Sequence, residues 1–145
     1  MAATVTLYNN ALREMAQGTI RFDGSTAMKL LLVANSSTYT ALKSHTVKTD
    51  FTGNGGVEAS GTLYTAGGNA VTFSSGSVTI DSGTNAINIA IPATSWPNST
   101  IPSVKAAILL TSLDKLVAYA DFGTTVSSSN STFTVTFSTP IKLQN

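Results

Sequence analysis

The feature that most constrains the fold is a succession of short alternating segments in the second half of the chain. Apolar and polar residues alternate at 70–73, 77–81 and 86–92, and most clearly at 132–138, where Phe133, Val135 and Phe137 share one face. Glycine, serine and asparagine between these segments are typical of turns. A half-buried strand alternates in this way, so the pattern predicts antiparallel β-structure.

Other segments extend this reading. The apolar run AMKLLLVA at 27–34 suits a central strand covered on both faces. Leu113 and Asp114 form a hairpin turn, whereas TSWPNSTIP at 94–102 carries two prolines and predicts an irregular crossing. Further strands are expected at 19–23, 104–112, 115–123 and 141–143. We therefore predict a mainly β fold, a single antiparallel β-sandwich or barrel of about eight short strands with an N-terminal α-helix.

The N-terminal segment has the spacing of a helix. Its apolar residues recur on one helix face: Leu7, Ala11, Leu12 and Met15. Thr4 or Thr6 is a candidate N-cap and Gly18 a candidate stop, which predicts a helix over residues 4–17. The helix is expected to pack on the sheet of its own domain, or to act as an arm that docks on a neighbour.

A long polar region at 41–68 is rich in glycine, and loops of this length are uncommon and usually functional. Asp50, Thr52 and Asn54 have the spacing of the first calcium ligands of an EF-hand, but the twelfth position is Gly61 instead of glutamate. The region therefore predicts a flexible turn rather than a calcium site.

Composition restricts the class of partner. The 145 residues suit one domain, 1–145. Charged residues make up 10 %, the net charge is +1 and the lysines are scattered, so no basic track is available for nucleic acid. No apolar run is long enough for a membrane span, and the first residues lack the pattern of a signal peptide, so we expect a soluble protein made in a cytoplasm. Serine and threonine outnumber charged residues more than twofold, which is typical of adhesins and coat proteins.

Reactive groups are few. Cysteine is absent and His45 is the one histidine, so the chain predicts no metal, cofactor or catalytic residue. A polysaccharide hydrolase would need two carboxylates, and Asp114 and Asp121 are the pair that a hairpin brings closest. We consider that pair more typical of exposed turns and expect no enzyme.

A binding role is more consistent with these residues. In SGTLYTAGG, Gly67 and Gly68 turn the backbone sharply into a strand, and Tyr64 is able to bury its ring while its hydroxyl meets water. Trp96 either fills a corner of the core or stacks on a sugar ring. The helix and the loop at 44–68 are the expected contact elements. The candidate interface residues are Leu7, Tyr8, Leu12, His45, Phe51, Tyr64 and Trp96.

Several motifs follow one another in a distinctive order: LYNNALREMAQGTIRFD, MKLLLVA, SGTLYTAGG, SWPNSTI, VAYADFG and SSSNSTFTVTF. In this order the chain resembles a family of small bacteriophage virion proteins often encoded among head and tail genes. The resemblance spans nearly the whole chain and implies a β-rich virion component without catalytic residues.

The resemblance implies a capsid decoration, or cement, protein. Such a protein would be made in the bacterial cytoplasm and would bind the surface of the assembled head. It would contact the major capsid protein and further copies of itself, as a homotrimer. The alternative is a tail or fibre component that recognises the host surface, with glycans as its ligand.

Overall fold

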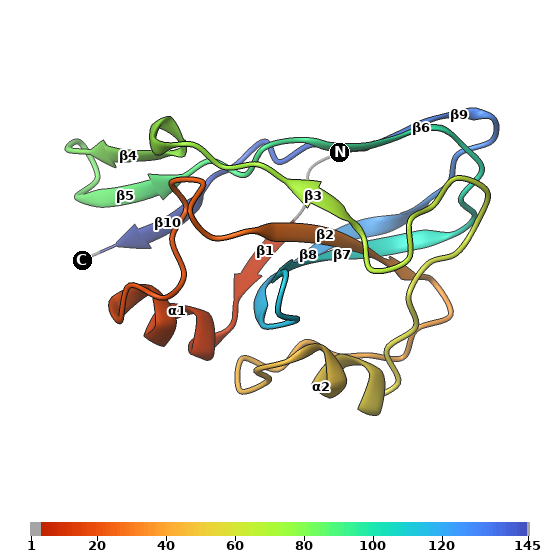
Figure 1. Ribbon diagram of the computed structural model, residues 1–145, viewed down its shortest axis with the longest axis horizontal. Helices are drawn as coiled ribbons and strands as arrows, with labels where there is room; N and C mark the ends of the chain where they lie inside the picture. Colours follow the sequence, from red (N-terminus) through yellow and green to blue (C-terminus); the bar gives the residue numbers. More distant parts are fainter. Residues whose placement is uncertain (1–3, 145) are drawn as a thin grey trace.

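The computed structural model describes residues 4–144, which form ten strands, two α-helices and one short 3₁₀ helix (Figure 1). The helices are α1 (Asn9–Ala16), α2 (Lys48–Gly53) and the 3₁₀ helix η1 (Ser75–Ser77). The strands are β1 (Thr4–Leu7), β2 (Met28–Ala34), β3 (Asn69–Val71), β4 (Val78–Asp81), β5 (Ala86–Ile89), β6 (Thr94–Ser99), β7 (Val104–Thr111), β8 (Leu116–Val126), β9 (Ser131–Val135) and β10 (Ile141–Gln144). The predicted mainly β, antiparallel class is confirmed, and the arrangement is sandwich-like.

The larger layer is a five-stranded antiparallel sheet in the order β1-β8-β7-β2-β3. At its centre β7 and β8 form the predicted hairpin, which pairs Ile108 with Tyr119, and β2 lies beside β7 with Leu31 opposite Ile108. At one edge β1 pairs with β8, which brings the first strand beside a segment more than 100 residues later in the chain. This sheet is the platform on which the rest of the molecule is built.

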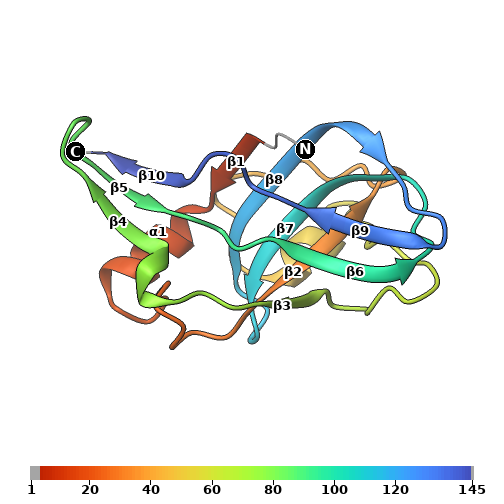
Figure 2. The same ribbon diagram turned by 90° about the horizontal axis from the view of Figure 1, so that it is seen from above.

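The second layer consists of two smaller sheets made from the same two stretches of chain. Strands β6 and β9 pair over the main sheet and cross it at an angle (Figure 2). Further along, the chains that leave them pair again as β5 and β10, with β4 beside β5. Pro92 and Pro140 lie in the connections between the two pairs, and proline lacks the N–H that a continuous ladder requires.

The core is divided by the main sheet into two apolar clusters. Along β2, Leu30 and Leu32 face the upper cluster, with Trp96 and Phe133 from the second layer. Leu31 and Val33 face the lower cluster, where Tyr39 and Phe51 cover the sheet. Figure 1 shows α1 and α2 below the sheet and β6 and β9 above it. The prediction that 27–34 forms a central strand covered on both faces is confirmed.

A segment without regular structure replaces a strand beside the second half of β2. Strand β3 pairs only with β2 residues as far as Leu30. Beyond it, the Ala34 N–H donates to the Val57 carbonyl at 2.9 Å, the Ala59 N–H donates to the Leu32 carbonyl at 2.8 Å, and the Leu32 N–H donates to the Tyr64 hydroxyl at 3.1 Å. We call residues 57–68 the strap. It ends at Gly68, where an added Cβ would lie 2.1 Å from the Leu30 carbonyl oxygen.

The prediction of a helix over residues 4–17 is wrong in its first half. Residues 4–7 form β1, and α1 begins at Asn9 with Tyr8 as N-cap, so neither Thr4 nor Thr6 caps it. The β-branched residues in TVTL alternate across a strand, and pairing with β8 outweighs the weak helical spacing. Gly18 does end the helix region, at a φ of +75° that favours glycine.

Two further predictions are corrected. Residues 19–23 form turns rather than a strand, because the Asp23 carboxylate accepts a hydrogen bond from the Ser25 N–H at 2.9 Å. Their alternation of apolar and polar residues reflects the burial of Ile20 and Phe22. Residues 94–99 form β6 rather than an irregular crossing. The ladder shifts register between Trp96 and Ser99, which accommodates Pro97 within the strand. The region 41–68 also contains α2, which the sequence did not indicate.

Candidate functional site

The first strand, β1, is a free edge of the main sheet. The Tyr8 N–H donates to the Val117 carbonyl at 3.1 Å, which marks that pair as hydrogen-bonded. Because such pairs alternate along an antiparallel ladder, Thr4 and Thr6 direct their backbone groups toward β8, whereas Val5 and Leu7 direct theirs away from the sheet. Strand β1 pairs with β8 alone, and within residues 4–144 no loop or turn adds a backbone hydrogen bond to the N–H or C=O of Val5 or Leu7.

One face of this edge opens into a groove of about 880 Å³ between β1, α1 and β10. We call it the apolar groove, after the side chains of Val5, Leu7, Leu12, Ile141 and Leu143 that line it. Two lysines, Lys43 and Lys142, lie on its lining, and none of the residues of 4–144 that line it carries a carboxylate. Lys142 has one weak ion pair, 4.0 Å from Asp81, and no carboxylate of residues 4–144 lies within ion-pair distance of Lys43. The groove is therefore apolar at its base and positive at its rim.

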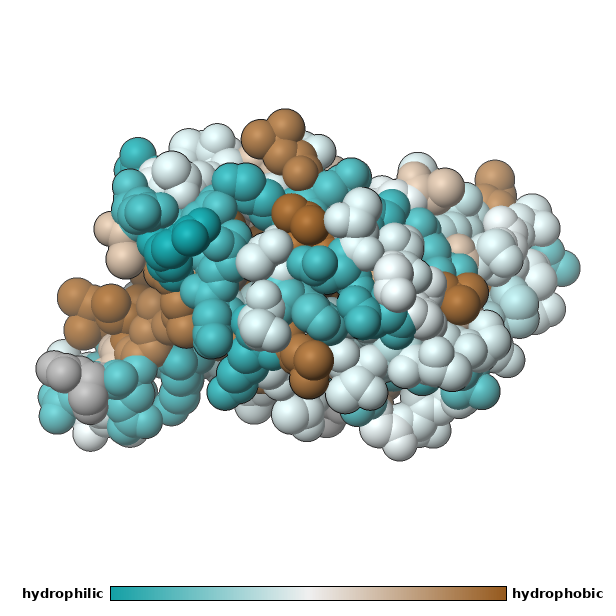
Figure 3. All heavy atoms as spheres, turned by 90° about the horizontal axis from the view of Figure 1, so that it is seen from below, coloured by the Kyte–Doolittle hydropathy of each residue, from teal (hydrophilic) through white to brown (hydrophobic). Residues whose placement is uncertain are grey.

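The groove continues onto the underside of the sheet formed by β4, β5 and β10. In register, Leu143 lies opposite Ile87, and Ile87 lies opposite Ile80, so the three side chains share one face. Ile80 is 82 % exposed and Ile87 is 41 % exposed. Figure 3 shows apolar side chains gathered at this end of the molecule. An exposed apolar surface that joins a groove marks a contact region.

The other face of β1 opens into a smaller hollow of about 480 Å³, which we call the polar hollow. Thr6 lies opposite Tyr119 and Thr4 lies opposite Asp121, so all four side chains point to this face. Residues 39–41 and Lys105 complete the lining, and the Lys105 ammonium donates to the Ser37 carbonyl. Burial, and then the nearby charge of Asp121, raises the pKa of Tyr119 to about 12. The hollow offers neutral hydroxyls with one cation and one anion.

A hydrogen-bonded chain of three side chains lies behind the polar hollow. The Tyr8 and Tyr39 hydroxyls are 2.9 Å apart, and the Tyr39 hydroxyl lies 2.8 Å from Nδ1 of His45. Burial raises the pKa of Tyr8 and of Tyr39 above the ordinary value. Both phenols therefore stay protonated at neutral pH, and the chain of hydroxyls positions the loop of His45 against the main sheet.

The structure divides the predicted interface residues into three groups. Leu7 and Leu12 line the apolar groove, and Leu12 is 40 % exposed, which fits a contact role. The prediction of Tyr8, Phe51 and Trp96 as surface contacts is wrong, because each side chain is at most 1 % exposed. Their apolar surface is buried in the core of the chain itself, where it stabilises the fold. His45 and Tyr64 are half-buried.

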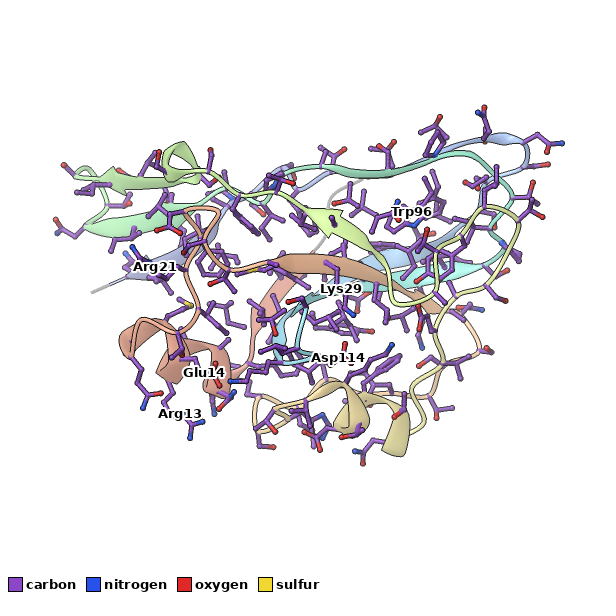
Figure 4. The ribbon with its side chains drawn as sticks, in the orientation of Figure 1. Arg13, Glu14, Arg21, Lys29, Trp96 and Asp114 are labelled. Atoms are coloured by element: carbon purple, nitrogen blue, oxygen red, sulfur yellow. The ribbon has the colours of Figure 1, made fainter. Side chains whose placement is uncertain are left out.

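Tyr64 holds the strap rather than a partner. Its ring stacks on Trp96 with centroids 5.9 Å apart, and its hydroxyl donates to Glu58 at 2.9 Å while it accepts from Leu32. Glu58 also accepts from the Gly67 N–H and pairs with Lys48 at 3.4 Å. Figure 4 places Trp96 between the two layers of the sandwich. The expectation that the Tyr64 hydroxyl meets water is therefore wrong.

The acidic residues considered for chemistry lie apart. Asp114 is at the β7–β8 turn, where it pairs with Lys29 at 3.0 Å (Figure 4), whereas Asp121 lies along β8 opposite Ala106. Six residues of turn and strand separate them in sequence, and the stretch of extended β8 from Leu116 to Asp121 alone spans about 16 Å, too far for a pair of glycosidase carboxylates. Asp50 accepts from the N–H groups of Thr46 and Val47 at 2.7 and 3.1 Å and so caps α2. Within residues 4–144 no cluster of three His, Asp or Glu side chains could hold a metal ion.

Sequence reasoning missed most of the residues around β1. Val5, Lys43, Tyr119 and Leu143 line the two hollows, yet none was a candidate. The alternation of TVTL was the available signal, because it marks a strand whose two faces differ. Over residues 4–144 no helix has the length and apolar character needed to cross a membrane. No family model matches the chain, and comparisons with curated proteins and with solved structures find no match.

Proposed function

We propose that this chain is a bacteriophage virion protein that binds the assembled head as a decoration protein and performs no catalysis. The observation that carries the proposal is the free edge of β1, where unpaired backbone groups lie between two hollows of different character. Unpaired strand edges pair with other chains, and native proteins normally protect them with proline, lysine or a covering loop. The sequence of β1, TVTL, contains none of these residues.

The motifs that carry the resemblance to phage virion proteins support the same proposal, because they form the parts that determine this fold. The GTI element follows α1, SGTLYTAGG forms most of the strap, and VAYADFG lies within β8. A sequence that keeps these motifs in this order is expected to keep the two-layer scaffold and the edge at β1.

Decoration requires a preference for the assembled state. A ligand that binds only assembled heads stabilises them by mass action, and many copies act together on one shell. We propose a homotrimer as the closed form that suits a local threefold axis. Light scattering after size-exclusion chromatography measures that state directly, and a monomer at micromolar concentration would refute this part.

The test of the function is binding to heads that lack the protein. Purified chain is mixed with expanded heads from a deletion strain, with unexpanded proheads and with unassembled capsid subunits, and binding is measured by co-sedimentation. We expect saturable binding to expanded heads alone and a higher temperature of head disruption. Absence of binding to expanded heads would refute the proposal.

The alternative is a tail or fibre component that recognises glycans, and it relies on an aromatic side chain that the structure shows to be buried. Trp96 is 1 % exposed and packs between Tyr64 and Phe133, so it has no free face for a sugar ring. Binding of the chain to host cells in the absence of heads would favour this alternative over decoration.

A further inference from the structure

We propose that β1 receives an extended segment of a partner protein as an added strand, and that this segment alternates apolar with polar residues and carries carboxylates. The inference rests on the proposed function in one respect, that a protein partner exists, and it names the site and the chemistry of that partner. Strand addition to a free edge is a general mode of peptide recognition, in which the backbone supplies affinity and alternate side chains supply specificity.

The backbone of β1 provides the first step. Val5 and Leu7 direct two N–H donors and two C=O acceptors away from β8, in the pattern of an antiparallel edge. No residue of 4–144 uses them. A strand placed beside β1 would pair with these four groups and extend the main sheet as far as the Lys43 carbonyl, which accepts from the Asn9 N–H at 2.8 Å just beyond Leu7.

The two hollows provide the second step. Side chains of an added strand alternate between its two faces, as those of β1 do. On one face they would enter the apolar groove beside Leu7, Leu12 and Leu143. On the other face they would enter the polar hollow beside Thr6 and Tyr119. The preferred segment therefore alternates, and its apolar residues all fall on one side.

Charge provides the third step. Lys43 and Lys142 lie on the apolar groove, and the lining contains no carboxylate. In the polar hollow, Lys105 and Asp121 balance each other. Counted over the described residues that line the two hollows, the surface around β1 is thus net positive, although the whole chain carries only +1. Carboxylates at the ends of the added segment would complement the lysines and speed association.

The size of the surface favours a strand over a second copy packed face to face. The underside of the β4–β5–β10 sheet is three strands wide and four residues long, which corresponds to about 14 by 13 Å. Such a face covers about 200 Å², whereas a stable dimer buries about 800 Å² on each partner. An extended segment instead makes backbone hydrogen bonds and fills both hollows, so it needs no broad flat contact.

The test uses the whole chain and three capped seven-residue peptides. The first has glutamate at positions 1 and 7, valine at 3 and 5 and threonine at 2, 4 and 6, so that the glutamates share the face of the valines and meet the lysines of the apolar groove. The second has the same composition with the valines grouped together, and the third has lysine at both ends. Binding is measured by titrating the peptide into isotope-labelled protein and following the backbone amide resonances. We expect the first peptide to shift Val5 and Leu7 most, to slow hydrogen exchange of their N–H groups, and to bind at least fivefold more tightly than the other two.

Two variants locate the site. Val5→Pro removes an outward N–H that the folded chain does not use, and proline is tolerated on a strand edge that faces solvent. Its matched control, Val5→Ile, keeps the N–H. We expect Val5→Pro to bind the first peptide about tenfold more weakly and Val5→Ile to bind it like the parent. Lys142→Glu lies on the groove with an exposed side chain, and it should reverse the preference between the first and third peptides.

The outcomes separate this inference from the proposed function. Equal binding of all three peptides, or no binding at millimolar concentration, would overturn the added strand. So would unchanged affinity in a folded Val5→Pro variant. If Val5→Pro still decorates expanded heads as the parent does, β1 is not the contact while decoration stands. If the first peptide binds at β1 and no heads are bound, the site stands and the partner is another protein.

Discussion

The hydroxyl of Tyr64 replaces a missing strand, and its removal should be costly. It accepts from the N–H of Leu32, a residue that is 0 % exposed, and it donates to the carboxylate of Glu58. In Tyr64→Phe the Leu32 N–H has no partner, which costs about 1–3 kcal/mol. Glu58 keeps Lys48 and the Gly67 N–H, so the lost donor there adds about 1 kcal/mol. We expect a total destabilisation of about 3 kcal/mol.

This figure is a large part of the stability of a small domain, which is about 5–15 kcal/mol. For a chain of this length it lowers Tm by about 10 °C. The measurement is urea unfolding at 25 °C, followed by tryptophan fluorescence, because Trp96 stacks on Tyr64. A matched control is Tyr119→Phe, whose hydroxyl makes no hydrogen bond within residues 4–144. Because no hydrogen bond is lost there, stability should change by less than about 0.5 kcal/mol. Equal stability of Tyr64→Phe and Tyr119→Phe would refute the role of the strap hydroxyl.

Three other predictions concern the backbone and the titrating groups. Gly67 and Gly68 both have φ near +90°, but a Cβ added at Gly67 would lie 3.7 Å from its nearest neighbour, whereas one added at Gly68 would lie 2.1 Å from the Leu30 carbonyl oxygen. Gly68→Ala should therefore destabilise the fold by about 2 kcal/mol more than Gly67→Ala in urea unfolding. Equal losses of stability would show that the close approach of Gly68 to β2 is unimportant. A hydrogen bond from Lys115 holds the pKa of Glu14 below its ordinary value of 4.5, so its stabilisation is present above that pH and is lost as the pH falls below it. Glu14→Gln should therefore cost about 1–2 kcal/mol at pH 7 and almost nothing at pH 3, and a pH-independent cost would contradict the ion pair. Burial raises the pKa of Tyr8 in the folded state, so the phenol holds its proton more tightly there than in the unfolded chain. The free energy of unfolding should therefore fall as the pH rises above about 10. An unfolding free energy that stays constant from about pH 9 to about pH 12 would be inconsistent with this burial.

Most of the strands could be predicted from the sequence because the spacing of apolar residues within each segment indicates a strand without reference to its partner. The run at β2 is apolar on both faces, and the structure gives it two clusters. The same method failed at residues 4–7, where four residues fit both a helix and a strand and only the distant partner β8 decides. The sequence also gives no sign that Glu14 is buried, because its burial depends on Lys115, which lies 101 residues later in the chain and pairs with it at 2.8 Å.

The contact surface was harder to predict for the same reason. Leu7 and Leu12 were recognised from helical spacing, although Leu7 belongs to a strand. Leu143 lies at the other end of the sequence and meets them only through the fold. The aromatic residues Tyr8, Phe51 and Trp96 are predicted contacts, yet all three are buried. Side-chain type alone does not distinguish a large residue that fills a core from one that meets a partner.

The pairing of β1 with β8 has a consequence for synthesis. Thr4 pairs with Asp121, so β1 leaves the ribosome long before its partner strand has been synthesised. Until then both of its edges are open. Loop closure over this distance is also slow compared with hairpin formation by β7 and β8. Newly made chains therefore pass through a period in which their N-terminal segment is available to chaperones, or to the same segment of a sister chain.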